Sequence, residues 1–247
     1  MTLDFHGQHA VVTGGTRGIG RRIVEDLAAL GATVIATGVQ AEGIERLNRE
    51  RPIANVTWRR VDFTDRLATE AFARELGSHD RIDVLVNNAG INRINAIEEC
   101  RLEDWDALTA VNLDAPFMLL RATAPVMRRA GYGRIVNIAS IWSEISRPKR
   151  AVYSATKFGL RGLTVAASTE LAAFNIMVNS VSPGFVLTEL TQQNLSEAEQ
   201  EELKGQIPAG RFADPAEISR AVIFLSSTLN TYITGQNIVV DGGFTNV

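Results

Sequence analysis

The feature that most constrains the fold of this 247-residue chain is a strand, a glycine-rich turn and a helix near its start. The short apolar run HAVVT occupies residues 9–13, and the turn TGGTRGIG occupies residues 13–20. Apolar side chains then recur at helical spacing through residues 21–30. Glycines let a backbone turn tightly against a pyrophosphate, and the free N–H groups at a helix start attract its negative charge. The pattern predicts a dinucleotide-binding unit, and a plain loop leading into a helix is the alternative.

The glycine spacing of this turn differs from the G-x-G-x-x-G form of many dinucleotide-binding proteins. Here the order is Gly14-x-x-x-Gly18-x-Gly20. Three glycines at one turn between a strand and a helix still favour a cofactor site over a plain loop. The residues of the turn that we expect to contact the cofactor are Gly14, Thr16, Arg17, Gly18, Ile19 and Gly20.

The end of the second predicted strand, residues 33–37, indicates which dinucleotide binds. An acidic residue usually meets a free ribose 2′-hydroxyl at this place, but residues 38–41 carry no carboxylate. Arg17 is the nearby base that would reach a 2′-phosphate, and Thr37 would add a hydroxyl donor. We therefore expect NADP(H) rather than NAD(H). NAD(H) remains possible, because Arg17 could equally be a solvated loop residue.

Two further strand ends are expected to contribute to the cofactor site. Residues 55–60 and 83–87 read as strands in the alternating order of strands and helices. A carboxylate after the first could accept from an adenine amino group, and small residues after the second let a cofactor lie against the backbone. For the asparagines after the second strand, local turn chemistry is the alternative. The expected contacts are Asp62, Phe63, Asn88, Ala89 and Gly90.

Strand-like and helix-like segments alternate along the whole chain. This order predicts an α/β fold: one Rossmann domain over residues 1–247, with a doubly wound parallel sheet and helices on both faces. Residues 185–210 are polar and charged, as in a substrate loop or lid with short helices. The other expected strands are 134–139, 175–182 and 237–241, and the expected helices are 41–51, 65–76, 101–112, 114–129, 151–173 and 215–225.

The candidate reaction centre consists of Tyr153 and Lys157, with Ser140 upstream. A spacing of four residues puts the tyrosine and the lysine on one face of a helix. A neighbouring ammonium favours the phenolate, so we expect a lowered pKa for Tyr153 and proton transfer near neutral pH. Ser140 follows an apolar strand, and its hydroxyl would hold the substrate oxygen there. The spacing alone also fits simple helix packing, and the dinucleotide-binding start favours catalysis.

Composition limits the other classes of function. The net charge of −3 gives no general footprint for nucleic acid or an anionic membrane. A single cysteine, Cys100, fits a reducing compartment, and residues 1–9 do not read as a signal peptide. No apolar run reaches membrane-spanning length, and the three histidines show no metal-ligand spacing. We expect a cytoplasmic protein that acts on a small molecule, with neither nucleic acid nor membrane as partner and no metal.

Taken together, these motifs resemble the short-chain dehydrogenase/reductase family over essentially the full chain. The match rests on residues 13–20, 87–90, 140, 153, 157, 183–184, 233–236 and 240–243. The resemblance implies that Tyr153 is the general acid in reduction or the base in oxidation. Lys157 would lower the pKa of this tyrosine and hold the nicotinamide ribose, and Ser140 would orient the substrate oxygen. Hydride transfer between nicotinamide and a carbonyl carbon is the implied chemistry.

The resemblance also implies roles that the residues alone do not suggest. Asn112 matches the fourth catalytic residue of the family, which supports a proton-relay water near the lysine. The implied assembly is a homotetramer, or a dimer, formed through the helices of 101–129 and 151–173. The segment that flanks the nicotinamide carboxamide corresponds to Pro183, Gly184, Val186 and Thr188.

Within this family the chain resembles 3-oxoacyl-acyl-carrier-protein reductases, which favours a ketone of the 3-oxoacyl or another β-keto type. A dehydrogenase of a sugar, polyol or other secondary alcohol is the second possibility, and a non-catalytic cofactor sensor is the third. Residues 146–150, SRPKR, put three bases before Tyr153, and Trp142 follows Ser140. One hypothesis is that these bases recognise an anionic substrate or a phosphopantetheine carrier. A solvated loop or a subunit contact is the alternative, and the apolar turn at 173–175 argues against a carrier.

Overall fold

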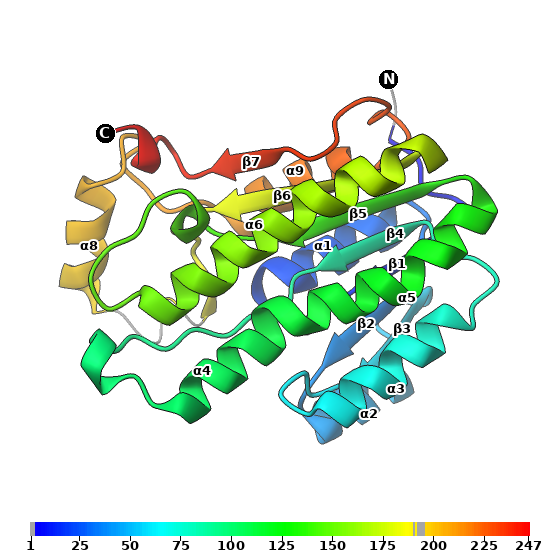
Figure 1. The fold of residues 1–247 in the computed structure, drawn as a ribbon, viewed down its shortest axis with the longest axis horizontal. Coiled ribbons are helices and arrows are strands. Elements are labelled where there is room, and N and C mark those ends of the chain that lie inside the picture. The colour runs from blue at the N-terminus through cyan, green and yellow to red at the C-terminus, as the bar shows by residue number, and fades with distance from the viewer. Residues whose placement is uncertain (1–2, 190, 192–195) are drawn as a thin grey trace.

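The structure is a computed structural model, and it describes residues 3–189, 191 and 196–247. Within these residues, seven parallel strands form one sheet in the order β3-β2-β1-β4-β5-β6-β7 (Figure 1). The order reverses direction between β1 and β4, so the crevice for a ligand is expected at the carboxyl ends of these two strands. The strands are β1 His9–Val12, β2 Thr33–Gly38, β3 Val56–Arg60, β4 Val84–Asn87, β5 Gly133–Ile138, β6 Ile176–Pro183 and β7 Asn237–Val240.

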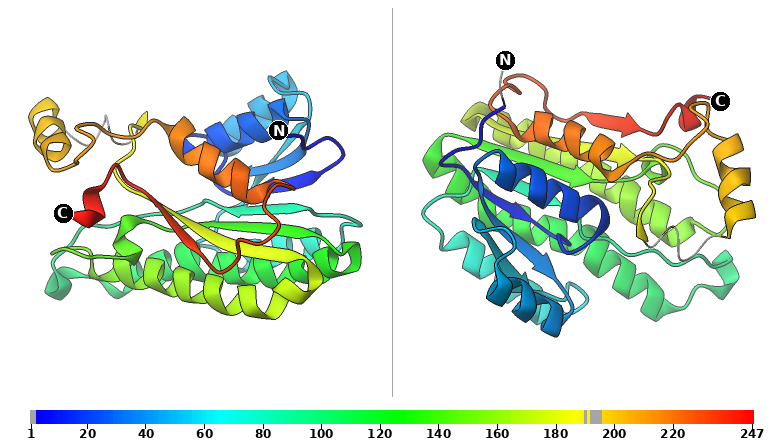
Figure 2. Two further views of the ribbon diagram at one scale, coloured as in Figure 1. Left: turned by 90° about the horizontal axis from the view of Figure 1, so that it is seen from above. Right: turned by 180° about the vertical axis from the view of Figure 1, so that it is seen from behind.

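Helices cover both faces of the sheet, as Figure 2 shows most clearly from above. On one face lie α1 Gly18–Ala29, α2 Ala41–Glu50 and α9 Pro215–Ser226. On the other lie α3 Arg66–Gly77, α4 Leu102–Thr109, α5 Ala115–Ala130 and α6 Ala151–Leu171. The short helix α8 Glu197–Gly205 lies beyond the carboxyl ends of the strands. The predicted doubly wound α/β fold is confirmed.

The central strands β1, β4, β5 and β6 are apolar on both sides because each contributes to two cores. Ala10 and Val12 of β1 belong to the core under α1 and α9, whereas Val11 belongs to the core under α3 and α5. Successive side chains of a strand point to opposite faces, so a sheet covered on both sides needs continuous apolar runs. This requirement explains why the strands read as uninterrupted apolar segments in the sequence.

Two helix starts follow the expected capping chemistry. Asp65 accepts hydrogen bonds from the backbone N–H of Leu67 at 2.8 Å and of Ala68 at 3.2 Å, so α3 begins there. Asp214 and Glu217 form a reciprocal capping box ahead of α9, whose first residue is Pro215. These bonds satisfy N–H groups that have no partner within the helix.

The two helices predicted over 101–112 and 114–129 are joined in the structure. A π-helical turn over Ala110–Asp114 links α4 to α5 into one continuous helical segment. Asp114 has helical dihedral angles and caps nothing, so it does not begin a new helix. The predicted break is therefore wrong. π turns inside helices commonly lie at functional sites.

Two features of the C-terminal half bear on the substrate side of the molecule. The strand predicted over 175–182 ends one residue too early. In the structure β6 extends to Pro183, which pairs in register with Val240 of β7. The predicted substrate loop 185–210 includes residues 190 and 192–195, which lie outside the described residues; its described part contains α8. No helix in the described ranges is long and apolar enough to cross a membrane.

Candidate functional site

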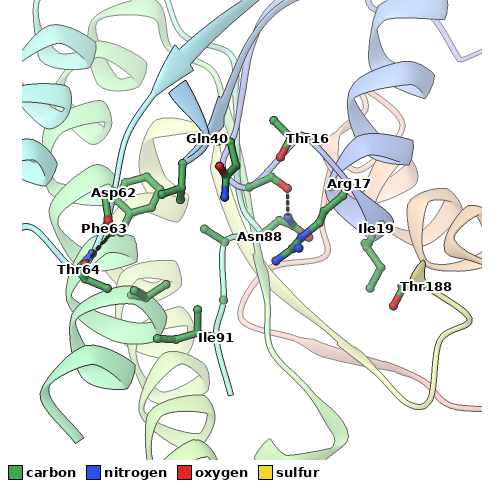
Figure 3. Close-up of a pocket in the computed structure, with 18 of the residues that line it drawn as sticks. Thr16, Arg17, Ile19, Gln40, Asp62, Phe63, Thr64, Asn88, Ile91 and Thr188 are labelled. Atoms are coloured by element: carbon green, nitrogen blue, oxygen red, sulfur yellow. Dashed lines mark hydrogen bonds between the residues drawn. The ribbon is translucent and has the colours of Figure 1, made fainter. Parts of the chain in front are cut away.

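A cavity of about 380 Å³ opens where the strand order reverses. Figure 3 shows Thr16 and Arg17 on one side and Asp62, Phe63 and Thr64 on the other. Twelve predicted cofactor residues line it: Gly14, Thr16, Arg17, Gly18, Ile19, Gly20, Asp62, Phe63, Asn88, Ala89, Gly90 and Thr188. The sequence analysis missed seven others, which are Gly38, Val39, Gln40, Thr64, Ile91, Val111 and Glu189. Most of these directly follow strand ends already assigned to the site, and that position was the available signal.

The glycine turn is shaped by close backbone contact. Gly14 and Gly18 have φ angles of +64° and +55°, a region that L side chains rarely adopt. A Cβ on Gly20 would lie 2.3 Å from both the Gly14 carbonyl oxygen and the Asn88 side-chain nitrogen. Asn88 in turn donates to the carbonyl oxygens of Thr13 at 2.8 Å and Gly14 at 3.1 Å. The turn is thus a closely packed cradle, in which a side chain would be strained at Gly14 and Gly18 and would clash at Gly20.

Thr37 supports this cradle from behind and does not line the cavity. Its side chain is 1% exposed, and its hydroxyl accepts the backbone N–H of Gly14 at 3.1 Å. Its carbonyl oxygen accepts the N–H of Gly15 at 2.8 Å. The predicted contact between Thr37 and the cofactor is therefore wrong, because the hydroxyl points to the turn within the protein interior.

The charged groups of the cavity fit a dinucleotide with a ribose 2′-phosphate, as in NADP(H). Arg17 is exposed at the cavity wall and forms no ion pair with any residue that the structure describes. No carboxylate follows β2, where Gly38, Val39 and Gln40 line the wall. On Asp62, Oδ1 accepts from the backbone N–H and the hydroxyl of Thr64, at 3.0 and 2.7 Å.

The candidate catalytic side chains meet beside this cavity. Tyr153 and Lys157 lie one turn apart on α6, with Nζ of the lysine 5.7 Å from the centroid of the tyrosine ring. Nζ also donates to the carbonyl oxygen of Ile138, the last residue of β5, at 2.8 Å. The Ser140 side chain lies close enough to the Tyr153 phenol to lower its pKa. A Cβ on Gly90 would lie 3.5 Å from Nζ, so Gly90 joins the cavity to the lysine.

The pKa values in this cluster differ from the sequence-based expectation. Burial raises the pKa of Tyr153, and this effect outweighs the lowering by the Ser140 side chain and by the charge of Arg150. Burial also lowers the pKa of Lys157 to about 8. The prediction that Lys157 lowers the tyrosine pKa is not met in this structure. Desolvation dominates for both groups, and the nearby cation that favours the phenolate is Arg150.

Asn112 lies in the π turn and connects two parts of the site. Its Oδ1 accepts the N–H of Ile91 and its Nδ2 donates to the carbonyl oxygen of Ile91, both at 2.9 Å. Nδ2 also donates to the hydroxyl of Thr156 at 3.1 Å. The side chain is fully buried. Asn112 therefore fixes the loop after β4 against α6, a positioning task that the family resemblance did not specify.

The predicted nicotinamide segment is divided in the structure. Thr188 lines the cavity, and a Cβ on Gly18 would lie 3.4 Å from its methyl group. Pro183 and Gly184 lie at the end of β6 against Val240, and Val186 forms a bridge with Ala213. These three residues do not line the described cavity, so their contact with the cofactor stays a prediction. Elsewhere, the described residues contain no cluster of three metal-ligating side chains.

A glycine cradle at the switch point of a parallel sheet, next to a tyrosine and a buried lysine, defines an NAD(P)-dependent oxidoreductase. A family model described as Enoyl-(Acyl carrier protein) reductase matches residues 14–245. The 3-oxoacyl-(acyl-carrier-protein) reductase FabG of Aquifex aeolicus is 41% identical, covering 98% of this chain and 99% of that protein. The chain belongs to the short-chain dehydrogenase/reductase family.

Two further relatives are named as dehydrogenases of a polyol and a sugar acid. The D-threitol dehydrogenase of Mycolicibacterium smegmatis is 38% identical, covering 99% of this chain and 97% of that protein. A crystal structure from Beutenbergia cavernae, described as a putative NAD(P)-dependent gluconate 5-dehydrogenase with bound NADP, superposes with a TM-score of 0.92. It is 36% identical, and the match covers 99% of both chains. Relatives of similar identity are thus named for different substrates.

Proposed function

We propose that this enzyme reduces a ketone to a secondary alcohol with NADPH, and that Tyr153 donates the proton. The observation that carries the proposal is the cluster of Tyr153, Ser140 and Lys157 at the end of the glycine cradle. That arrangement would bring a proton donor to the place where a nicotinamide would meet a substrate. The 3-oxoacyl reductase relative supports the direction of the reaction.

The cofactor site fits NADPH on the chemistry of its side chains. Gly14, Gly18 and Gly20 line the cavity at the start of α1 and carry no side chain, so a pyrophosphate could approach the backbone N–H groups there. The guanidinium of Arg17, which has no ion pair among the described residues, would bind the 2′-phosphate, and Asp62 would accept from the adenine amino group. The NADP named with the gluconate 5-dehydrogenase relative supports the same choice.

In the proposed mechanism, the residues of the glycine turn would hold NADPH, which would supply the hydride for the carbonyl carbon. Ser140 holds the carbonyl oxygen through its hydroxyl, and Tyr153 donates its phenolic proton to that oxygen as the alcohol forms. A raised tyrosine pKa suits this direction, because the phenol stays protonated at neutral pH. Lys157 would bind the ribose hydroxyls, and Asn112 would keep α6 and the loop after β4 at a fixed distance.

Oxidation of a sugar, polyol or other secondary alcohol is the second candidate, favoured by the threitol dehydrogenase relative. The same residues would act in reverse, with Tyr153 as the base.

A homotetramer is also proposed, because α5 exposes Phe117 and α6 exposes Phe158 and Val165, each more than 40% accessible. Light scattering that gave a monomer mass would contradict this assembly. A cytoplasmic location stays a prediction from the sequence.

The test compares NADPH and NADH oxidation with acetoacetyl-CoA, keto sugars and cyclic ketones. Tyr153→Phe is expected to lower kcat by about a hundredfold or more, since general acid catalysis contributes on that scale. Arg17→Met should raise the KM for NADPH by about tenfold or more while leaving the KM for NADH almost unchanged. Arg129→Met, an exposed change at the far end of α5, serves as the matched control. Activity that survives in Tyr153→Phe would refute the assigned role.

A further inference from the structure

Two arginines are held together on one indole ring beside the candidate reaction centre. The guanidinium carbons of Arg147 and Arg150 lie 5.1 and 5.7 Å from the centroid of the Trp142 ring. Trp142 is itself buried and packs edge-on against Phe244, with centroids 6.3 Å apart. The indole therefore fixes where both cations lie.

The charge of Arg150 is not balanced within the described part of the chain. Arg150 is 8% exposed, and its Nε is buried without a hydrogen-bond partner. The carboxylate nearest in sequence belongs to Glu144, which accepts from Arg161 at 2.8 Å and from Asn237 at 2.6 Å. A buried cation without a partner is costly, and a second cation beside it increases that cost.

Electrostatics give the same picture of a cation that needs an anion. Burial and the neighbouring charge of Arg147 both lower the pKa of Arg150. If these side chains only packed against Trp142, one arginine or an apolar side chain would fill the space at a lower desolvation cost. Two converging guanidinium groups, one of them buried, are instead the usual arrangement for binding a carboxylate or phosphate.

The position of Arg150 ties this charge to the reaction. Arg150 is the residue immediately before α6, and Tyr153 lies three residues further on, in the first turn of that helix. The charge of Arg150 is close enough to lower the pKa of the Tyr153 phenol. An anion bound at Arg150 would therefore lie on the same molecule as the carbonyl that Tyr153 protonates.

We propose that Arg150, with Arg147 beside it, binds a carboxylate of the substrate, so that the enzyme acts on a small oxo-carboxylate. This inference rests on the proposed ketone reduction and specifies its substrate class. The planar fork of Arg150 offers two parallel donors to the two carboxylate oxygens. The reacting end of a carrier-bound 3-oxoacyl thioester has no carboxylate, so the inference argues against a carrier-bound substrate.

The test uses pairs of ketones that differ only in the carboxylate. Levulinate is compared with methyl levulinate, and a keto sugar acid, 5-keto-D-gluconate, is compared with the neutral keto sugar L-sorbose. The wild-type enzyme is expected to prefer at least one acid over its neutral partner by about tenfold or more in kcat/KM. Arg150→Met should abolish this preference, because it lowers activity on the acid by about tenfold more than activity on the neutral ketone. The lost charge beside Tyr153 would affect both ketones of a pair alike.

Further variants separate charge recognition from packing. Arg150→Lys should retain part of the preference, Arg147→Met should weaken it less than Arg150→Met, and Arg129→Met should leave it unchanged. An equal loss of activity on acids and neutral ketones in Arg150→Met would show that the arginine only supports the structure. Equal kcat/KM values for acids and neutral ketones in the wild type would also overturn the inference.

A binding experiment distinguishes failure of this inference from failure of the proposed function. Succinate, which has neither a ketone nor a hydroxyl group, is titrated calorimetrically into the enzyme with saturating NADP⁺. Binding that is at least about tenfold weaker in Arg150→Met supports the carboxylate site even if no ketone is reduced. Absence of succinate binding, together with turnover of neutral ketones only, overturns the site while the proposed reduction stands.

Discussion

Replacing Lys157 with methionine is expected to stabilise the folded protein at neutral pH while removing its activity. Lys157 is 3% exposed, and its hydrogen bond to the Ile138 carbonyl oxygen is its single interaction with a polar atom among the described residues. A buried ammonium loses its hydration, and no carboxylate compensates it here. Methionine keeps a long, flexible and apolar chain in the same space.

The magnitude follows from the pKa of the lysine. Lowering this pKa from 10.5 to about 8 corresponds to roughly 3 kcal/mol, since one pH unit is about 1.4 kcal/mol. The variant leaves the Ile138 carbonyl oxygen without its donor, which costs about 1 to 2 kcal/mol. The net gain is about 1 to 2 kcal/mol, or a rise in Tm of roughly 2 to 8 °C for a chain of this size.

The pH dependence has a definite sign. Below pH 8 the lysine is protonated in both the folded and the unfolded states, so the full penalty is present. Between pH 8 and 10.5 the folded state releases the proton first. The unfolded state then binds more protons, and the stability of the wild type rises with pH. The difference between the variant and the wild type should therefore shrink across that window.

The assay is urea unfolding without cofactor at fixed protein concentration, at about pH 7 and about pH 10. Lys204→Met is the matched control, because Lys204 lies on α8 and pairs with Glu201 at the surface. Its effect should stay within about 0.5 kcal/mol at both pH values. The reasoning about burial would be refuted by a Lys157→Met protein that is less stable at pH 7, or by a pH-independent difference.

Three other variants, with Gly43→Ala as a control, test the cradle and its supports. Gly20→Ala should lower the stability by about 2 kcal/mol or more and abolish NADPH binding measured by fluorescence, because its Cβ would meet backbone oxygen. Gly43→Ala, in the open interior of α2, should instead raise the Tm slightly. Thr37→Val should weaken binding of NADPH and NADH equally, and a selective loss of NADPH would restore the rejected contact. Asn112→Ala should destabilise the fold by roughly 1 to 3 kcal/mol in urea unfolding and lower kcat; unchanged stability would contradict its positioning role.

Local chemistry determined much of this protein. Continuous apolar runs predicted a parallel sheet covered on both faces, and Asp65 and Asp214 marked helix starts by bonds to residues two or three positions away. The glycine turn and the Tyr153–Lys157 spacing placed the cofactor cradle and the reaction centre. These features depend on neighbours along the chain, so a single sequence contains them.

Tertiary structure decided the features that depend on distant neighbours. Whether Thr37 faces the cavity depends on the Gly14 backbone 23 residues away. The π turn at Asn112 accompanies bonds to Ile91 and Thr156, in other parts of the chain. The pKa of Tyr153 is raised and the pKa of Arg150 is lowered mainly by burial. Burial sums over the whole fold, so residue spacing alone does not predict it.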